Sequence, residues 1–310
     1  PPAAGLLPFW SPDVRKRLAR FDVLLVAGMK VMQQYIYHEP SRAVPEQTRL
    51  VHLDDDPWEL GKNYPVEVGV VGHPQPSLEE LASLLDAVMT PEAIEAARAR
   101  TAQHGKANRQ ERESLRREAQ SQADVRPMTP LGMLESLVRV LPDDVAVIEE
   151  APTTTGAYFE RAGVLKNIDG FFAQRGWALG WGLNCAIGVK LAWPDRPVLA
   201  LIGDGSAMYG IQGLWTAAHY RLPVTFVITN NTEYKILKNC AQELKLPEAC
   251  AGRFLGLDLV DPAIDYVGLA RSLAVPARRI MEPDELSQAV RESLAGDAPQ
   301  LIEVPVKDPG

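Results

Sequence analysis

Two polar segments each follow an apolar run in the second half of the chain. Asp204 comes directly after the run 197–202 and its glycine, and Asn231 comes after the run 224–229. Each run has the length and composition of a buried strand, and residues 211–220 between them are typical of a helix. A helical crossover makes the two strands parallel and brings their carboxyl ends to one edge of a sheet, where open α/β sheets bind ligands.

The residue types at this edge indicate a metal and an anion. Asp204 offers a carboxylate and Asn231 an amide carbonyl, both hard oxygen ligands suited to Mg²⁺ or Ca²⁺, which also take phosphate oxygens. Gly203 and Gly205 allow a sharp turn with close backbone approach, and Ser206 opens toward a helix whose free amides favour an anion. The alternative is that Asp204 only caps a helix and the asparagines form a turn. The spacing of the two segments favours a diphosphate held through a divalent metal.

These motifs resemble the signature of the thiamine diphosphate-dependent enzymes. The segment 203–209 together with Asn230 and Asn231 matches that signature, and 203–209 with 214–220 is more similar to the benzoylformate decarboxylase branch than to the acetolactate synthase branch. Residues 179–183 resemble a further family motif, although Asn184 stands where the family usually has proline. The resemblance extends over nearly the whole chain.

The resemblance implies a set of site residues. Leu179 would act in catalysis as the apolar wedge that props the cofactor into its bent form. The metal, Mg²⁺ or Ca²⁺, would bind Asp204, Asn231 and the backbone carbonyl of Glu233. Ile236, Leu237 and Cys240 would line the substrate pocket, and for Cys240 a place in the apolar face of a helix is an equal alternative. The expected contacts of thiamine diphosphate are Thr153, Thr154, Leu179, Gly203, Asp204, Gly205, Ser206, Asn231 and Tyr234.

The predicted fold class is α/β, with open parallel sheets flanked by helices. By resemblance, residues 1–90 form a partial middle domain, 91–126 a charged connecting segment, and 127–310 the thiamine diphosphate- and metal-binding domain. The pyrimidine-binding domain of the family, with its activating glutamate, is absent from these residues. Glu149 and Glu150 follow a strand-like run but would lie beside the diphosphate half of the cofactor. We therefore expect part of a larger or split enzyme that is inactive alone.

The resemblance implies a thiamine diphosphate-dependent 2-keto acid decarboxylase or carboligase. Its substrate would be a small 2-keto acid or an aldehyde. Its partners would be a pyrimidine-binding domain and a second subunit in a homodimer or homotetramer. Three alternatives stay open: an acetolactate synthase-like ligase, an acyloin or diketone lyase, and a non-catalytic chain that binds the cofactor or serves as a scaffold.

Composition argues against two further classes of protein, those that bind nucleic acid and those that span a membrane. The net charge of −8 argues against a nucleic-acid partner, and no run of roughly eighteen apolar residues predicts a membrane span. The three cysteines lack metal-ligand spacing, which favours free thiols in a reducing, cytoplasmic compartment. The acidic run 54–56 is interpreted as a loop rather than a metal site. Residues 77–89 predict a helix with Ser77 as its N-cap.

Overall fold

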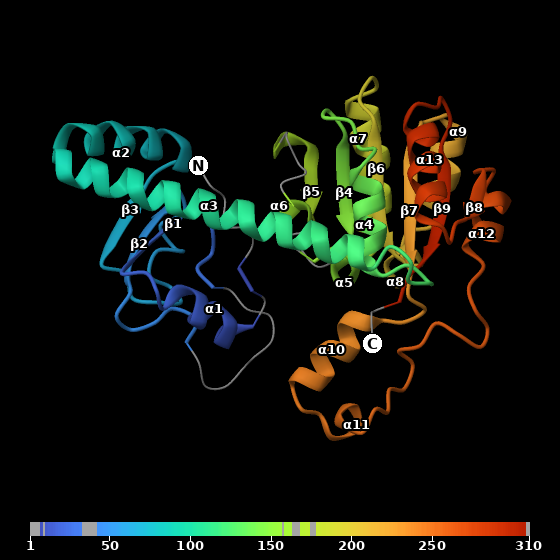
Figure 1. Cartoon of the computed structure of the whole chain (residues 1–310), viewed down its shortest axis with the longest axis horizontal. Coiled ribbons are helices and arrows are strands. Elements are labelled where there is room, and N and C mark those ends of the chain that lie inside the picture. The colour runs from blue at the N-terminus through green and yellow to red at the C-terminus, as the bar shows by residue number, and fades with distance from the viewer. Residues whose placement is uncertain are drawn as a thin grey trace. The chain divides into compact units, whose positions relative to one another are not determined.

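The chain forms two compact units, each built on a parallel sheet with helices. The computed structural model describes residues 7–8, 10–32, 42–156, 158–162, 168–173 and 178–307. The units are Pro1–Lys106 and Ala107–Gly310, and Figure 1 shows the elements of each. All strand pairs in both sheets are parallel. The predicted α/β class is therefore confirmed.

Helix α3 (Pro91–Ser121) carries the mixed charges of the segment expected to connect domains. It is one continuous helix of 31 residues, and the division between the units falls inside it. Only Leu115 and Ala119 of this helix are buried. Within the described part of the chain, neither this helix nor any other has the length and apolar character needed to span a bilayer.

The first unit has a three-stranded sheet. Its strands pair in the order β1-β2-β3, and α1 contributes Val14 and Leu18 to a core with Val26 and Leu50. These strands are rich in leucine and β-branched residues, which suit a pleated, half-buried surface. The elements are α1 (Ser11–Leu18), β1 (Val23–Ala27), β2 (Arg49–Asp54), β3 (Val68–Val71) and α2 (Pro74–Val88).

The start of α2 corrects one sequence expectation. The helix begins at Pro74, and its N-cap position is His73, which makes no capping hydrogen bond through its side chain. Ser77 therefore lies inside the first turn, and the prediction that it caps the helix was wrong. Proline is suited to the first helical position because its φ is already helical and its missing amide needs no partner there.

The second unit has a six-stranded sheet in the order β5-β4-β6-β7-β9-β8. Its elements are α4 (Pro130–Val138), β4 (Ala146–Glu150), α5 (Pro152–Thr155), α6 (Tyr158–Ala162), a 3₁₀ turn (Ile168–Gly170), β5 (Phe171–Ala173), α7 (Trp181–Ala192), β6 (Val198–Gly203), α8 (Asp204–Ala207), α9 (Gly213–His219), β7 (Thr225–Asn230), α10 (Lys235–Glu243), α11 (Pro247–Cys250), α12 (Tyr266–Ser272), β8 (Ala277–Arg279), α13 (Pro283–Leu294) and β9 (Gln300–Pro305).

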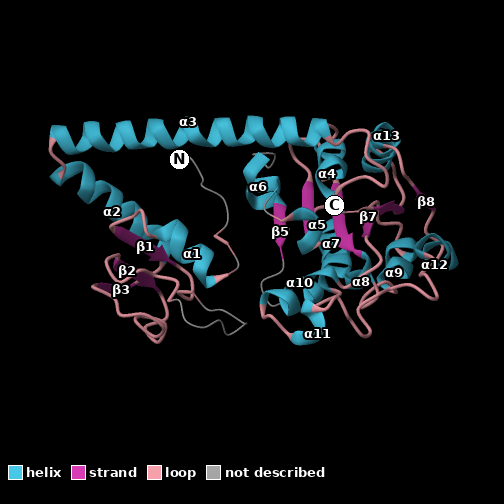
Figure 2. Cartoon of the chain, turned by 60° about the horizontal axis from the view of Figure 1, so that its bottom comes forward, coloured by secondary structure: helices cyan, strands magenta, loops and turns pink. Residues whose placement is uncertain are grey.

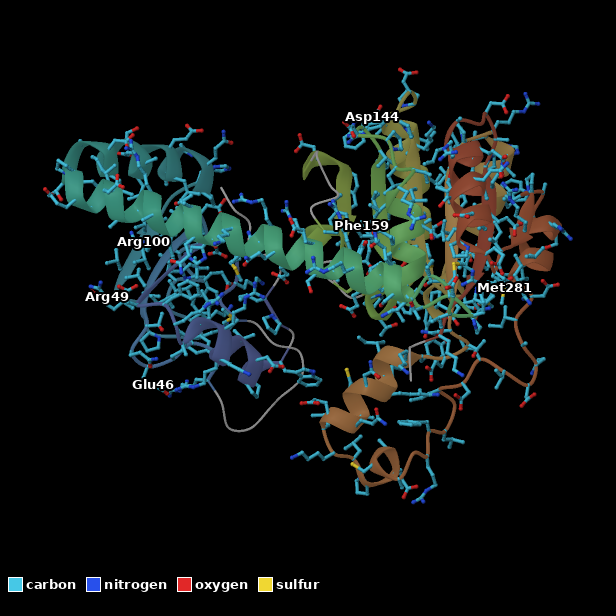
Figure 3. All side chains as sticks on the ribbon, in the orientation of Figure 1. Glu46, Arg49, Arg100, Asp144, Phe159 and Met281 are labelled. Atoms are coloured by element: carbon cyan, nitrogen blue, oxygen red, sulfur yellow. The ribbon has the colours of Figure 1, made fainter. Side chains whose placement is uncertain are left out.

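Helices cover both faces of this larger sheet. Alternate side chains of a strand point to opposite faces, so Leu199 and Leu201 of β6 pack with α4 and α13, while Ala200 and Ile202 pack with α7 and α9. Figure 2 shows the two helix layers on opposite sides of the strands. Phe159 of α6, labelled in Figure 3, is 1% exposed and belongs to the core on the α4 and α13 side of the sheet. Strands buried on both faces explain the continuous apolar runs in the sequence.

The core on the α7 side supports a stability prediction. Phe226 of β7 is fully buried, so Phe226→Ala should lower the free energy of unfolding by about 3–5 kcal/mol through lost burial and the cavity it leaves. Urea unfolding measures the loss. Leu255→Ala is the control, because Leu255 is 100% exposed and its truncation should change stability by no more than about 0.5 kcal/mol. Equal losses for the two variants would contradict this packing.

Candidate functional site

The carboxyl ends of β6 and β7 lie side by side at one edge of the larger sheet. The strands pair with Gly203 opposite Thr229, so the segments that follow them begin at the same level. Asp204 follows β6, and residues 231–233 follow β7. The prediction that these two segments meet at one sheet edge is confirmed.

Asp204 is a buried acid whose carboxylate holds the loop after β7. Only 3% of the residue is exposed. The Gly205 amide donates to Oδ1 at 2.8 Å and the Thr232 amide donates to Oδ2 at 2.6 Å. Burial raises the pKa of Asp204 to about 6, and backbone hydrogen bonds from Gly205, Thr232, Asn231 and Glu233 offset part of that rise. The carboxylate is thus mainly ionised at neutral pH and faces backbone amides.

The loop itself is strained at one residue. Thr232 has φ of +61°, a left-handed conformation that costs a residue with a side chain roughly 1 kcal/mol. Its amide donates to Asn230 Oδ1 at 3.0 Å as well as to Asp204. The Glu233 amide donates to Asn231 Oδ1 at 3.1 Å. These hydrogen bonds stabilise the turn. The side chain of Asn231 stays within the loop, because its Oδ1 accepts from the Glu233 amide.

The two asparagines differ in their surroundings. Asn230 donates through Nδ2 to Glu303 Oε1 at 2.7 Å. Glu303 lies on β9, is fully buried, and accepts from Arg279 Nη2 at 2.9 Å. Asn230 is therefore tied into the sheet, whereas Asn231 belongs to the loop. This agrees with the sequence choice of Asn231, and not Asn230, as the candidate ligand.

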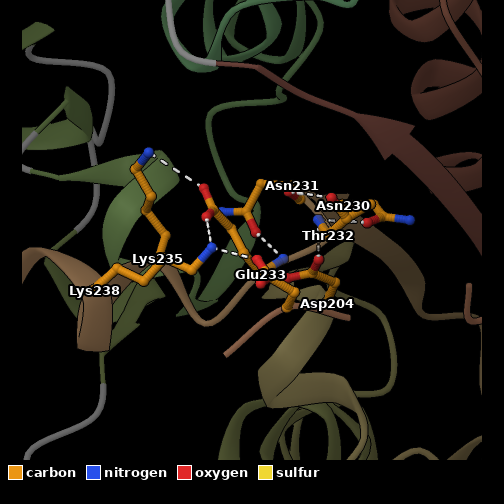
Figure 4. A network of polar contacts seen from close by, with 8 residues as sticks. Asp204, Asn230, Asn231, Thr232, Glu233, Lys235 and Lys238 are labelled. Carbon is orange, nitrogen blue, oxygen red and sulfur yellow. Dashed lines mark hydrogen bonds and ion pairs between the residues drawn. The ribbon is translucent and has the colours of Figure 1, made fainter. Parts of the chain in front are cut away.

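The side chain of Glu233 is held by two lysines (Figure 4). Lys238 donates to Glu233 Oε2 at 2.6 Å, and Lys235 lies 3.2 Å from Oε1. Burial by itself would raise the pKa of the Glu233 carboxyl, but the two lysines outweigh it and hold that pKa below its usual value. The side chain is thus occupied by ion pairs. Only the backbone carbonyl of Glu233 remains for the role predicted from the sequence.

A pocket of about 220 Å³ lies beside this loop. Thr153 and Thr154 of α5 line it together with Asn231 and Glu233. The Thr154 hydroxyl donates to Thr229 Oγ1 at 3.2 Å, which fixes α5 against β7. The remaining lining residues are Pro130, Lys235, Val306 and Lys307. The structure therefore brings both predicted threonines to the predicted asparagine, at a pocket that also holds cationic side chains.

The ring of Tyr234 packs directly against Gly205. A Cβ on Gly205 would lie 2.6 Å from Cε1 of Tyr234, so no other residue fits at position 205 while the ring stays in place. Burial raises the pKa of the Tyr234 hydroxyl, and Tyr209 and Asp204 add to the rise. Ser206, in α8, is 8% exposed. Gly205 and Tyr234 thus lie close to Asp204, and the predicted contacts of these residues with a cofactor stay a prediction.

Leu179 lies at the entrance to α7 and is 41% exposed. The next residue, Gly180, has φ of +86°. The amides of Gly180 and Gly182 donate to Glu150 Oε1 and Oε2 at 2.8 and 2.7 Å, and Glu150 is 2% exposed. A Cβ on Gly182 would lie 2.8 Å from Cβ of Glu150. Leu179 is therefore an accessible apolar side chain on a fixed backbone.

The three predicted substrate residues lie on α10. Ile236 and Cys240 are half-buried and share one helix face at a spacing of four residues, while Leu237 is 49% exposed. None of them lines the pocket beside Thr153. Burial raises the pKa of the Cys240 thiol, which lowers the fraction of reactive thiolate. Their predicted pocket role stays a prediction.

The donor set at this edge fits a hard divalent cation. It combines one buried carboxylate, one amide oxygen and one backbone carbonyl, all from Asp204, Asn231 and Glu233. Within the residues the structure describes, no group of three or more His, Cys, Asp or Glu side chains is placed to hold a metal. A cation here would therefore depend on these mixed oxygens together with ligand phosphate and water, as Mg²⁺ commonly does.

Two features of the site were not found from the sequence. The resemblance implies only that Glu150 lies beside the diphosphate half of the cofactor, whereas in the structure its carboxylate accepts the free amides at the start of α7. Lys238 carries no motif signal, because its partners Glu233 and Asp258 are brought to it by folding. The position of Glu150 at the end of a strand indicates a sheet-edge role but not which one.

The acidic run at the end of β2 has local partners. Asp54 Oδ1 accepts from the Asp56 amide at 3.0 Å, and Asp56 Oδ1 accepts from the Trp58 amide at 2.9 Å. Aspartates commonly form such turns with backbone two residues on. Residues 55–56 lie in a loop as interpreted, whereas Asp54 is still the last residue of the strand.

Family comparisons match both parts of the chain. Residues 1–81 match the central domain of thiamine pyrophosphate enzymes, and residues 164–304 match their C-terminal thiamine pyrophosphate-binding domain. The chain is 33% identical over 307 residues to benzoylformate decarboxylase of Pseudomonas aeruginosa, covering 98% of this chain and 52% of that protein. It is 28% identical over 273 residues to the acetolactate synthase large subunit of Parasynechococcus marenigrum, covering 84% of this chain and 40% of that protein.

Solved structures give the same picture. The thiamine diphosphate-dependent 4-hydroxybenzoylformate decarboxylase of Rhodococcus jostii RHA1 superposes with a TM-score of 0.75 at 28% identity, covering 98% of this chain and 52% of that one. The chain thus spans about half the length of the curated relatives it matches.

The contacts of Glu150 generate a stability prediction. Glu150→Ala should lower the free energy of unfolding by about 3 kcal/mol, because buried amides at the start of α7 lose a charged acceptor. Glu150→Gln keeps one acceptor oxygen and should lose less. Urea unfolding of the three proteins measures the order. Glutamine and alanine variants of equal stability would contradict the role assigned to these hydrogen bonds.

The same residue predicts a pH dependence. Burial raises the pKa of Glu150 above its usual 4.5, so the folded protein binds this proton more tightly than the unfolded chain. That contribution is complete below the unfolded value and is lost as pH rises through the raised folded value. The stability advantage of wild type over Glu150→Ala should therefore shrink as pH rises above the usual value of 4.5. An advantage that grows with pH would contradict the direction of the shift.

Proposed function

The chain belongs to the thiamine pyrophosphate enzyme family, and from this premise we propose that it holds the diphosphate end of thiamine diphosphate through a divalent cation. The observation that carries the proposal is the meeting of Asp204 with the loop 231–233 at one edge of a parallel sheet. We assign this role to residues 127–310, with 1–90 as part of a middle domain and 91–126 as the connection. The whole protein would act as a 2-keto acid decarboxylase or carboligase.

The cation would be Mg²⁺ or Ca²⁺, bound by Asp204, Asn231 and the carbonyl of Glu233. The buried carboxylate of Asp204 supports this choice, since a buried charge is stabilised by a nearby opposite charge. Thr153, Thr154, Ser206 and the Gly203 and Gly205 backbone would contact the diphosphate, together with Tyr234. When bound, the cofactor supplies the electron sink for cleavage beside a keto group.

Leu179 would support the cofactor from the α7 side. Its exposed side chain and its fixed backbone at Gly180 suit a wedge that must touch a ligand without moving. Ile236, Leu237 and Cys240 would then offer apolar surface to the substrate. The substrate proposed is a small 2-keto acid or aldehyde with an apolar group.

A decarboxylase is supported by the benzoylformate decarboxylase relative, which is 33% identical over 98% of this chain, and by the solved 4-hydroxybenzoylformate decarboxylase. Extent of similarity does not separate it from a ligase, because acetolactate synthase relatives match up to 93% of the chain. An acetolactate synthase-like ligase, supported by those relatives, or an acyloin or diketone lyase is the second candidate. Product analysis with a 2-keto acid, alone and with an added aldehyde, separates release of an aldehyde from ligation.

We also propose a homodimer or homotetramer. Trp215 of α9 and Tyr220, which follows that helix, are 53% and 62% exposed, and His219 stacks on Trp215 with ring centroids 4.8 Å apart. An exposed aromatic group of this kind is typical of a contact surface. A cytoplasmic location completes the proposal, supported by three free cysteines.

Asp204→Ala should abolish Mg²⁺-dependent binding of thiamine diphosphate. The change removes the charged ligand and releases the amides that order the loop, and the expected loss of affinity is at least about 100-fold, or roughly 3 kcal/mol. Titration calorimetry with Mg²⁺ present and absent measures it. Asp55→Ala, on the acidic loop of the first unit, is the control and should bind as wild type does. Unchanged affinity in Asp204→Ala would sink the assignment.

Leu179→Ala should lower turnover of the complete enzyme more than it weakens cofactor binding. The side chain would touch the reacting part of the cofactor, whereas the anchor lies at Asp204. We expect kcat to fall by about 10-fold or more, with the thiamine diphosphate Kd changed by less than about 3-fold. Leu191→Ala, an exposed leucine near the other end of α7, is the control. Equal effects on kcat and Kd would contradict a wedge role.

A further inference from the structure

Lys238 joins the loop after β7 to a distant segment of the chain. Its ammonium group donates to Glu233 Oε2 at 2.6 Å and also pairs with Asp258. Only 13% of its side chain is exposed, and its Nζ lies 5.3 Å from the ring centre of Phe254. Figure 4 shows the lysine reaching from α10 toward the loop that includes Glu233. The protein therefore shields this ion pair from water more than it would shield an ordinary surface pair.

The two segments that Lys238 joins are also paired through their backbones. The Tyr234 amide donates to the Leu257 carbonyl at 2.8 Å, and the Leu259 amide donates to the Thr232 carbonyl at 2.7 Å. Glu233 and Asp258 form an antiparallel bridge between them. Like charges placed opposite each other in an antiparallel pair are destabilising. Lys238 offsets that repulsion because it contacts both carboxylates.

The loop is consequently fixed from two sides. On the inner side, Asp204 accepts the Thr232 amide at 2.6 Å. On the outer side, the antiparallel bridge pairs Glu233 with Asp258. Thr232 keeps its left-handed backbone between these two restraints. Loss of the outer restraint would free a strained turn to relax and would move its carbonyl oxygens.

We propose that Lys238 is a positioning residue for the metal site: by bridging Glu233 and Asp258, it holds residues 231–233 in the geometry that offers their oxygens to a divalent cation. This inference rests on the proposed function for the cation itself. In this role Lys238 would act on the backbone of the loop and not as a ligand of the cation.

Lys235 provides an internal comparison. It also pairs with Glu233, at 3.2 Å, but it lies at the pocket beside Thr153 and is 30% exposed. The side-chain ion pairs that link Glu233 to Asp258 are made by Lys238. If bridging is what matters, removing the charge of Lys238 should loosen the loop more than removing that of Lys235.

The first test follows backbone hydrogen exchange in the cofactor-free protein. In Lys238→Met the amides of residues 232–234 and 257–259 should exchange about 10-fold faster or more, and Lys238→Arg should restore much of the protection. Arg253→Met is the matched control, because it removes an exposed ion pair with Glu248 in the neighbouring segment. Unchanged exchange in Lys238→Met, or an equal increase in Lys235→Met, would overturn the proposal.

The second test titrates Mg²⁺ at saturating thiamine diphosphate. Lys238→Met should weaken Mg²⁺ about 10-fold to 100-fold, the usual effect of losing a residue that orients metal ligands. The thermal transition of each variant shows that it is folded. Wild type and Asp204→Ala are measured in parallel. A wild-type protein without Mg²⁺-dependent cofactor binding would contradict the proposed function and the metal role together, whereas normal wild-type binding with unchanged Mg²⁺ affinity in Lys238→Met would overturn the positioning role alone.

Discussion

The burial of the Asp204 carboxylate is the constraint on which the site depends. A charge removed from water is costly unless hydrogen bonds or an opposite charge compensate it. Here the compensation comes from backbone amides, including that of Thr232 on the next strand's loop. The loop must therefore turn inward, and the left-handed Thr232 follows from that requirement. Gly205 and Tyr234 then pack around the same carboxylate, where a larger residue at 205 has no room.

Two further buried carboxylates work in the same way along this sheet. Glu150, at the end of β4, accepts the amides that begin α7. Glu303, on β9, accepts from Arg279 and from Asn230, which ends β7. Each acid thus ties a strand to a neighbouring element. The strands themselves are fixed by their parallel hydrogen bonding and by cores on both faces. The hydrogen bonds of the buried carboxylates then position the loops relative to these strands.

Burial of these carboxylates has a cost in free energy. Burial raises the pKa values of Asp204 and Glu150, which shows that both are less stable as anions here than in water. A cation beside Asp204 would relieve part of that cost. Lys238 contributes from the other side of the loop, where it keeps Glu233 and Asp258 together. Sites that bind charged ligands often retain such locally unfavourable features because binding depends on them.

The sequence determined the fold class and the meeting of Asp204 with Asn231. Apolar runs of strand length, separated by a helical stretch, leave few alternatives to parallel pairing, and parallel pairing places both strand ends at one edge. The same local rules failed at Ser77, because Pro74 could already begin the helix three residues earlier. Local pattern alone could not choose between two acceptable starts.

Tertiary structure alone decided which side chains complete the site. Glu150 meets Gly180 and Gly182 some thirty positions along the chain, and Lys238 meets Asp258 because residues 257–259 return to pair with the loop. No spacing or periodicity encodes these contacts, since they depend on the path of connecting loops and on the direction of each side chain. Hydrophobic periodicity is a property of neighbours in sequence, so it fixes the elements and the sheet edge. The charge pairs across that edge form only when folding brings distant residues within a few ångströms of each other.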